Sequence, residues 1–279
     1  MFPEIILKPG KDESVLRFHP WVFSGAIAKK PDNIDEGDYV VVKSAEGRLL
    51  GIGHYQIGSI TVRILEFNRD TLTDDHYYNR LNNACELRKS LGLIRPDNNC
   101  FRLVHGEGDF LPGLIVDIYG DTAVMQAHSP GMHFERNRIA EALTRLHEIN
   151  IRNVYYKSET TLPYKARLDP HNDYLIGSYD GNIAIENGLQ FNIDWLKGQK
   201  TGFFVDQREN RALLEKFARG RKVLNMFCYT GGFSVYAMRG GAISVDSVDS
   251  SAKAAALTDA NIALNFPNDK RHTCLFYTY

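Results

Sequence analysis

The feature that most constrains the fold is a strand, turn, helix and strand between residues 223 and 249. Val223–Cys228 is a short, nearly continuous apolar run, which is typical of a strand buried on both faces. A Gly-rich turn, a short helix ending near Arg239 and a second strand, Ala242–Val248, follow it, and this strand ends in Asp249. The order predicts a βαβ unit of a parallel sheet and the first half of a nucleotide-binding α/β domain.

The turn favours an adenosine-type ligand. Gly231 and Gly232 remove Cβ atoms where the chain must turn tightly, and the amides at the helix start are free to donate hydrogen bonds. Asp249 follows the turn at close to the spacing of about 20 residues at which an acid binds ribose hydroxyls in dinucleotide folds. The alternative is a βαβ unit whose glycines serve packing alone.

The same turn discriminates between nucleotide classes. It lacks the GxGxxG pattern of NAD sites, and no Gly-Lys-Ser or Gly-Lys-Thr follows it, which disfavours a phosphate-binding loop. S-adenosylmethionine (SAM) has no phosphates, so a shorter turn suffices, with Phe227 and Tyr229 as apolar walls for the adenine. SAM is the favoured ligand, and a fragment of a NAD-type oxidoreductase is the weaker alternative.

The rest of the chain divides by pattern into three parts. Residues 1–70 read as short strands and predict a small β-barrel, in which Gly51 and Gly53 indicate a bulge or a tight corner. Residues 71–186 predict a central α+β domain, and residues 187–279 hold the βαβ unit. The elements expected in the last two parts are helices over about 73–93 and 134–147, strands over 114–119 and 122–126, and a helix that begins with a capping box at Asp206–Glu209 and stops at Gly220.

Composition excludes several classes of protein. The 33 basic and 34 acidic residues give a net charge of −1, so an RNA partner would have to meet a local patch rather than a bulk positive field. Four scattered cysteines without a CxxC pair disfavour a zinc site and indicate a reducing compartment. The N-terminus lacks the apolar core of a signal peptide, and no stretch reaches a membrane span. We expect a soluble, cytoplasmic protein with no metal and no membrane partner.

Three segments of the sequence resemble one protein family. Gly198–Arg211, Val223–Ser234 and Val248–Ser251 look like the bacterial class I SAM-dependent 23S ribosomal RNA cytosine-5 methyltransferases. His19–Ser24 and the strands over 37–63 are similar to that family's N-terminal PUA domain, an RNA-binding β-barrel, and Arg102–Leu114 resembles its central domain. The resemblance implies a PUA-like barrel, a central α+β domain and an incomplete Rossmann-like methyltransferase domain, with 23S rRNA as partner.

The resemblance also implies a cofactor site. The segment from Lys200 to Arg208 would fold over SAM, the Gly-rich turn would run beneath its methionine moiety, and Asp249 would hold the ribose. Asp206 and Arg208 have an alternative role in capping a helix. Phe203 and Phe204 could instead be residues of the hydrophobic core. Trp21 could stack on an RNA base or pack in the core of the barrel. Cys228 reads as inert packing. The implied cofactor-binding residues are Lys200, Phe203, Asp206, Arg208, Phe227, Tyr229, Thr230, Gly231, Gly232, Asp249 and Ser250.

The catalytic groups of the resembled family are expected beyond Tyr279. Methylation of cytosine C5 needs a cysteine thiolate that adds to C6, an acid near N3 and a base. The family supplies these groups from an Asp-Pro-Pro segment and a cysteine motif, neither of which occurs here, and residues 271–279 do not match it. We therefore expect a C-terminally truncated, inactive or incomplete methyltransferase, through a frameshift or a shortened gene. The alternative is a non-catalytic RNA-binding protein with a vestigial methyltransferase stub, and a homodimer is left open.

Overall fold

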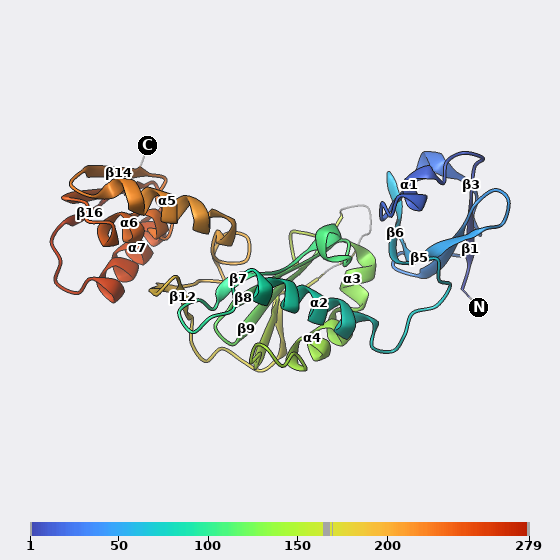
Figure 1. The fold of residues 1–279 in the computed structure, drawn as a ribbon, viewed down its shortest axis with the longest axis horizontal. Coiled ribbons are helices and arrows are strands. Elements are labelled where there is room, and N and C mark those ends of the chain that lie inside the picture. Colours follow the sequence, from blue (N-terminus) through green and yellow to red (C-terminus); the bar gives the residue numbers. More distant parts are fainter. Residues whose placement is uncertain (1, 164–167, 169, 278–279) are drawn as a thin grey trace. The chain divides into compact units, whose positions relative to one another are not determined.

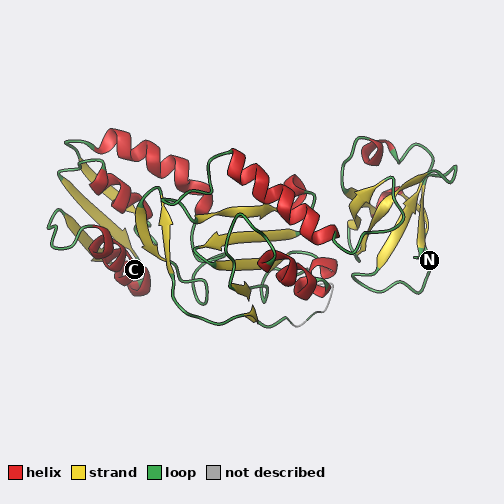
Figure 2. Ribbon diagram, turned by 60° about the horizontal axis from the view of Figure 1, so that its bottom comes forward, coloured by secondary structure: helices red, strands yellow, loops and turns green. Residues whose placement is uncertain are grey.

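The computed structural model describes residues 2–163, 168 and 170–277, which fall into two units with their own contacts. The first unit holds the residues up to 92 together with 103–117 and 121–178, and the second holds 93–102, 118–120 and the residues from 179 onward. Along the chain, the N-terminal part is nearly all strand, and helices and strands alternate after it (Figures 1 and 2). The division into domains 1–70, 71–186 and 187–279 stays a prediction.

The N-terminal part of the first unit is the predicted barrel. Its strands form one six-stranded sheet in the order β2-β6-β5-β4-β1-β3 around a core that includes Ile5, Val40 and Val62. The predicted bulge is confirmed, because the β5–β6 register shifts at Gly53, where a Cβ would lie 2.1 Å from the Arg63 carbonyl oxygen. The elements are β1 (Glu4–Leu7), α1 (Glu13–Leu16), β2 (Trp21–Phe23), β3 (Ile27–Lys29), β4 (Tyr39–Lys43), β5 (Leu49–Tyr55) and β6 (Ile60–Phe67).

The central part of the chain forms a five-stranded sheet in the order β11-β10-β9-β8-β7. The helix expected over about 134–147 is present as α4, Arg136–Thr144. A short helix that the sequence did not predict, α3, precedes it, where the Ser129 side chain caps the helix start and Pro130 is its first residue. The elements are α2 (His76–Ser90), β7 (Cys100–His105), β8 (Leu114–Tyr119), β9 (Thr122–Ala127), α3 (Pro130–Phe134), α4 (Arg136–Thr144), β10 (Asn153–Tyr156) and β11 (Asp173–Ile176).

The second unit contains the predicted parallel βαβ arrangement. Strands β14, β15 and β16 pair in parallel in that order, with α6 and α7 packed on the sheet. Helix α5 ends at Ala218, and Gly220 follows at a φ of +70°, as expected of a helix stop. The elements are β12 (Ile183–Glu186), β13 (Leu189–Asn192), the 3-10 turn Val205–Gln207, α5 (Arg208–Ala218), β14 (Lys222–Met226), α6 (Gly232–Arg239), β15 (Ser244–Asp249), α7 (Ala252–Asn265) and β16 (His272–Phe276).

Two expectations for this unit are wrong. Strand β14 is not buried on both faces, since Leu224 is 63% exposed and Met226 45% exposed. In the part of the chain that the structure describes, β14 pairs with β15 alone, and its covered face is the one on which Asn225 bonds to Ser234 of α6. The capping box is also absent. The 3-10 turn delays α5 to Arg208, which places Asp206 too early to cap it.

A buried histidine of the barrel lies against the central part of the first unit. His54 on β5 is 2% exposed, and a Cβ on Gly131 of α3 would lie 2.1 Å from its ring. Neither ring nitrogen has a hydrogen-bond partner among the described residues. Burial, followed by the charges of His76 and Arg63, lowers the pKa of His54 to about 3.

We expect His54 to make the protein acid-sensitive. An unfolded histidine takes up a proton below a pH of about 6.5, while folded His54 stays neutral down to about 3, so its contribution to stability falls as the pH drops through that window. Between pH 7.5 and pH 5 the loss is about 2 kcal/mol. Between these two pH values, the free energy of unfolding measured with urea should fall by about 2 kcal/mol less in His54→Leu than in wild type. The exposed His147→Gln should keep the wild-type loss, and an equal loss in His54→Leu would contradict the assignment.

Candidate functional site

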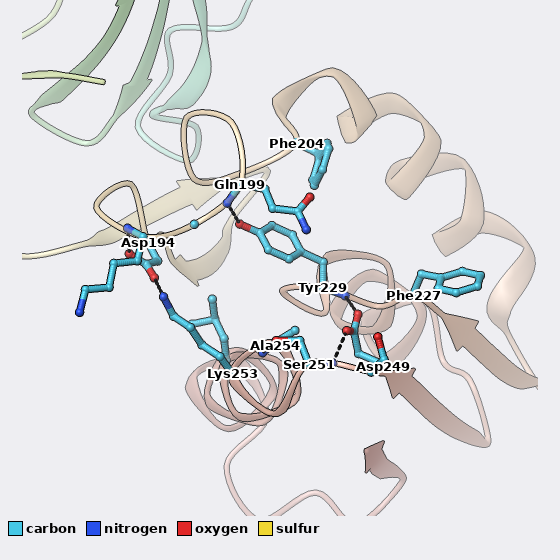
Figure 3. A pocket seen from close by; sticks show the side chains of 13 residues that line it. Asp194, Gln199, Phe204, Phe227, Tyr229, Asp249, Ser251, Lys253 and Ala254 are labelled. Atoms are coloured by element: carbon cyan, nitrogen blue, oxygen red, sulfur yellow. Dashed lines mark hydrogen bonds and ion pairs between the residues drawn. The ribbon is translucent and has the colours of Figure 1, made fainter. Parts of the chain in front are cut away.

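A pocket of about 470 Å³ lies at the carboxyl ends of β14 and β15 in the second unit (Figure 3). Its volume is in the range of small-molecule sites, and this edge of a parallel sheet is where such folds bind ligands. Its walls come from the segment after β13, the turn after β14, the end of β15 and the start of α7. The lining residues are Asp194, Lys197, Gly198, Gln199, Phe204, Phe227, Tyr229, Asp249, Ser250, Ser251, Lys253, Ala254 and Leu257.

The turn between β14 and α6 has an unusual backbone. Phe227, Tyr229 and Gly231 have φ values of +57°, +48° and +74°, and the first two are side-chain-bearing residues in the left-handed region. Such conformations persist where the surrounding structure enforces them, often at ligand sites. At Gly231 a Cβ would lie 2.7 Å from Thr258 Cγ2 of α7, so a glycine is required for α7 to approach this closely.

Gly231→Ala should therefore destabilise the second unit more than a positive φ alone explains. Gly220→Ala is the matched control, because its φ is +70° and nothing lies within 4 Å of an added Cβ. The control should cost about 1 kcal/mol for the left-handed conformation. Gly231→Ala should cost a further 1–3 kcal/mol for the overlap with Thr258. Urea unfolding of both variants checks this, and equal losses would rule out the close packing.

Asp249 is held at the end of β15 by two backbone amides. Its Oδ2 accepts a hydrogen bond from the Tyr229 N–H at 3.0 Å, and its Oδ1 accepts one from the Ser251 N–H at 2.9 Å. A carboxylate has about four acceptor positions, so both oxygens can accept further hydrogen bonds. The side chain is thereby oriented as an acceptor for a pair of neighbouring hydroxyls, such as those of a ribose.

The segment 194–204, called the strap below, lies across from this turn. The Gln199 N–H donates to the Tyr229 hydroxyl at 2.9 Å, and that hydroxyl donates to the Gly202 carbonyl oxygen at 3.3 Å. Lys253 of α7 forms an ion pair with Asp194 at the other end of the strap. Figure 3 shows Tyr229 between Gln199 and Asp249, with Phe227 turned away from it.

The structure brings four of the sequence-predicted residues into the pocket: Phe227, Tyr229, Asp249 and Ser250. Gly231 and Gly232 form the turn and the start of α6, Asp206 and Arg208 lie at the start of α5, and the Lys200 ammonium lies 4.8 Å from the centre of the Phe204 ring. Phe203 and Thr230 are each 3% exposed, with Phe203 packed against Phe191 and Arg211. All eleven cofactor roles stay predictions.

The sequence analysis did not name nine of the pocket residues as cofactor-binding, although Phe204 among them lies in the segment 200–208 that was expected to fold over SAM. Ser251 offered a signal, because it caps α7 by accepting from the Ala254 N–H, and a Ser ahead of an alanine run is a typical helix start. The ion pair of Asp194 with Lys253 joins residues far apart in the sequence, and no motif indicates it. The nine are Asp194, Lys197, Gly198, Gln199, Phe204, Ser251, Lys253, Ala254 and Leu257.

The pocket residues fit the three chemical parts of SAM. Asp249 suits the ribose hydroxyls, and the apolar side chains of Leu257 and Ala254 with the Tyr229 ring suit the adenine. The charged side chains of Asp194 and Lys197 at the strap suit the amino and carboxylate groups of the methionine end. When bound, SAM supplies an electrophilic methyl group.

In residues 2–163, 168 and 170–277, no group of three His, Cys, Asp or Glu side chains could hold a metal ion. No helix of the same residues has the length and apolar character to cross a membrane.

Comparisons with known proteins agree with this fold. The family of PUA-like domains matches residues 5–67, and the family of S-adenosylmethionine-dependent methyltransferases matches residues 124–275. The chain therefore belongs to the SAM-dependent methyltransferases, with a PUA-like domain at its N-terminal side, and SAM is the cofactor of that family. The predicted fold class is confirmed.

Curated relatives match nearly the whole chain in sequence. The ribosomal RNA large subunit methyltransferase I of Alteromonas mediterranea is 39% identical over 275 residues, which cover 97% of this chain and 68% of the relative. The protein of the same name from Tolumonas auensis is 35% identical over 269 residues, 95% of this chain and 67% of the relative. This chain thus spans about two thirds of the length of these relatives.

Solved structures show the same fold. A Streptococcus mutans protein, provisionally described as a SAM-dependent methyltransferase, superposes with a TM-score of 0.81 over 99% of this chain and 71% of its own, at 23% identity. A second provisionally described methyltransferase, in complex with S-adenosylhomocysteine (SAH), has a TM-score of 0.82 over 99% of this chain and 70% of its own, at 23% identity.

Proposed function

We propose that the pocket between the strap and Asp249 binds SAM, and that the protein acts on ribosomal RNA of the large subunit. The observation that carries the cofactor site is the orientation of Asp249 by the Tyr229 and Ser251 amides beside the left-handed turn. The relatives named as large-subunit ribosomal RNA methyltransferases support the substrate class.

The finer proposal is methylation of cytosine C5 in 23S rRNA, in the cytoplasm. Its support is the sequence resemblance of Gly198–Arg211 and Val223–Ser234 to the cytosine-5 family. The PUA-like domain is proposed to contact the RNA. Trp21 is half-buried, and its indole N–H donates to Glu107 at 2.7 Å, so a stacking role for this ring stays a prediction.

A non-catalytic RNA-binding role is the second candidate, and the cysteines favour it. C5 methylation needs a reactive thiolate, whereas burial raises the pKa of Cys85 to about 11, of Cys274 to about 12, and also that of Cys228. Residues 1–279 also contain no Asp-Pro-Pro segment. For residues 1–279 alone we expect cofactor binding without methyl transfer to C5.

Two assays on the purified chain test the proposals. Calorimetric titration with SAH should give one saturable site, and its absence would exclude the cofactor site. Incubation with methyl-labelled SAM and large-subunit rRNA, followed by nucleoside analysis, measures transfer directly. Label in 5-methylcytidine would establish the C5 activity and contradict the non-catalytic candidate. RNA binding that weakens with salt, without transfer of label, would favour the non-catalytic candidate.

A further inference from the structure

One side-chain hydroxyl of the pocket wall bridges two backbone groups in the middle of the strap. The Tyr229 hydroxyl accepts from the Gln199 N–H and donates to the Gly202 carbonyl, so it bridges two backbone groups of the strap three residues apart. Burial raises the pKa of this hydroxyl above its usual value of 10, which keeps it protonated and able to donate at neutral pH. Through its own N–H, Tyr229 also contacts Asp249. One residue therefore connects the strap to the proposed ribose site.

The strap is shaped for this contact. A Cβ on Gly198 would lie 2.8 Å from the Tyr229 hydroxyl oxygen and 2.1 Å from the Asp194 carbonyl oxygen, so only glycine allows so close an approach. Lys200 has a φ of +49° and Gly202 a φ of +119°, both in the region that disfavours side chains. A segment with this backbone needs contacts from outside to keep its conformation.

We propose that Tyr229 is a positioning residue, whose hydroxyl holds the strap closed over the nucleoside of SAM or SAH and thereby slows its release. This inference rests on the proposed cofactor site. The strap and Asp249 line the same pocket, so a ligand on Asp249 can leave more easily when the strap opens. The ion pair of Lys253 with Asp194 holds the first residue of the strap, and Thr201 is hydrogen-bonded through its hydroxyl to the Tyr119 hydroxyl at 2.9 Å. The backbone groups of Gln199 and Gly202 that face the pocket wall are held by the Tyr229 hydroxyl.

Tyr229→Phe isolates the hydroxyl from the ring. The ring packs edge-to-face against Phe204 with 5.4 Å between ring centroids, and phenylalanine keeps that contact. Tyr179→Phe is the matched control in the same unit, because Tyr179 is 51% exposed and lies outside the pocket lining. Two measurements apply to wild type and both variants: SAH association and dissociation rates by stopped-flow fluorescence or surface plasmon resonance, and amide hydrogen exchange of the strap in ligand-free protein.

The loss of two hydrogen bonds should release SAH about tenfold faster in Tyr229→Phe, with little change in the association rate. The Gln199 amide should exchange at least fivefold faster in the same variant, and the free energy of global unfolding should fall by no more than this opening accounts for. Tyr179→Phe should match wild type in both measurements. An unchanged dissociation rate of SAH in Tyr229→Phe would overturn the inference. Exchange of the Gln199 amide hydrogen at the wild-type rate in this variant would overturn it as well. If wild type binds no SAH, the cofactor proposal fails instead, and the exchange of Gln199 still decides whether the hydroxyl holds the strap.

Discussion

Arg211→Met should lower the free energy of unfolding of the second unit by about 3–5 kcal/mol, the largest effect expected in this protein. Arg211 is 2% exposed, and its guanidinium donates to both carboxylate oxygens of Glu186 at 2.8 and 2.7 Å. Tyr236 donates a third hydrogen bond to Glu186 at 2.9 Å. Without the guanidinium, a fully buried carboxylate would lose its counter-charge, and the cost of that burial causes the loss.

Two further variants separate the charge from the packing. Arg211→Met combined with Glu186→Leu removes both charges and should recover most of the stability, since an apolar pair of similar volume often replaces a buried ion pair at little cost. The exposed Arg219→Met should change stability by less than about 0.5 kcal/mol. Urea denaturation measures all three. A loss in the double variant as large as that in Arg211→Met would show that the unpaired charge is not the cause.

The second large effect is expected on cofactor affinity. Asp249→Asn should weaken SAH binding about 10- to 100-fold, because hydrogen bonds to a charged group contribute about 1.5–3 kcal/mol each. The asparagine keeps one oxygen to accept a backbone N–H, but its amide NH₂ faces the other donor and one ribose hydroxyl. Calorimetric titration of the variant with SAH gives the affinity.

Asp246→Asn is the control for this substitution. Asp246 lies on the same strand, three residues before Asp249, and is outside the pocket lining. It should bind SAH as wild type does. Thermal unfolding of both variants checks that the strand is intact. Wild-type affinity in a folded Asp249→Asn protein would remove the ribose assignment.

Local pattern predicted the parts of the fold that depend on short segments. Alternating strands predicted the barrel, and an apolar run with a glycine turn predicted the βαβ unit. The exposure of Leu224 and Met226 was not predictable, because the sequence of an apolar strand does not show whether one or both of its faces will be covered by other elements. The start of α5 at Arg208 depends on a 3-10 turn, which competes with the capping pattern at Asp206.

The candidate site was predictable where one loop forms it. The turn from Phe227 to Gly231 and the acid at Asp249 are close in sequence and carry recognisable chemistry. The opposite wall of the pocket was not predictable from the sequence. Its contacts, Asp194 with Lys253 and Gln199 with Tyr229, join residues that are far apart in the chain and meet only in the folded protein. The resemblance implied a cofactor role for Lys200, whose ammonium lies over the Phe204 ring.

A crystal structure of the chain grown with SAH tests the central claim most directly. We predict density for the nucleoside in the pocket between the strap and the turn, with both ribose hydroxyls within hydrogen-bond distance of the Asp249 carboxylate. SAH bound elsewhere, or an empty pocket in crystals grown at saturating SAH, would contradict the assignment of this pocket as the SAM site.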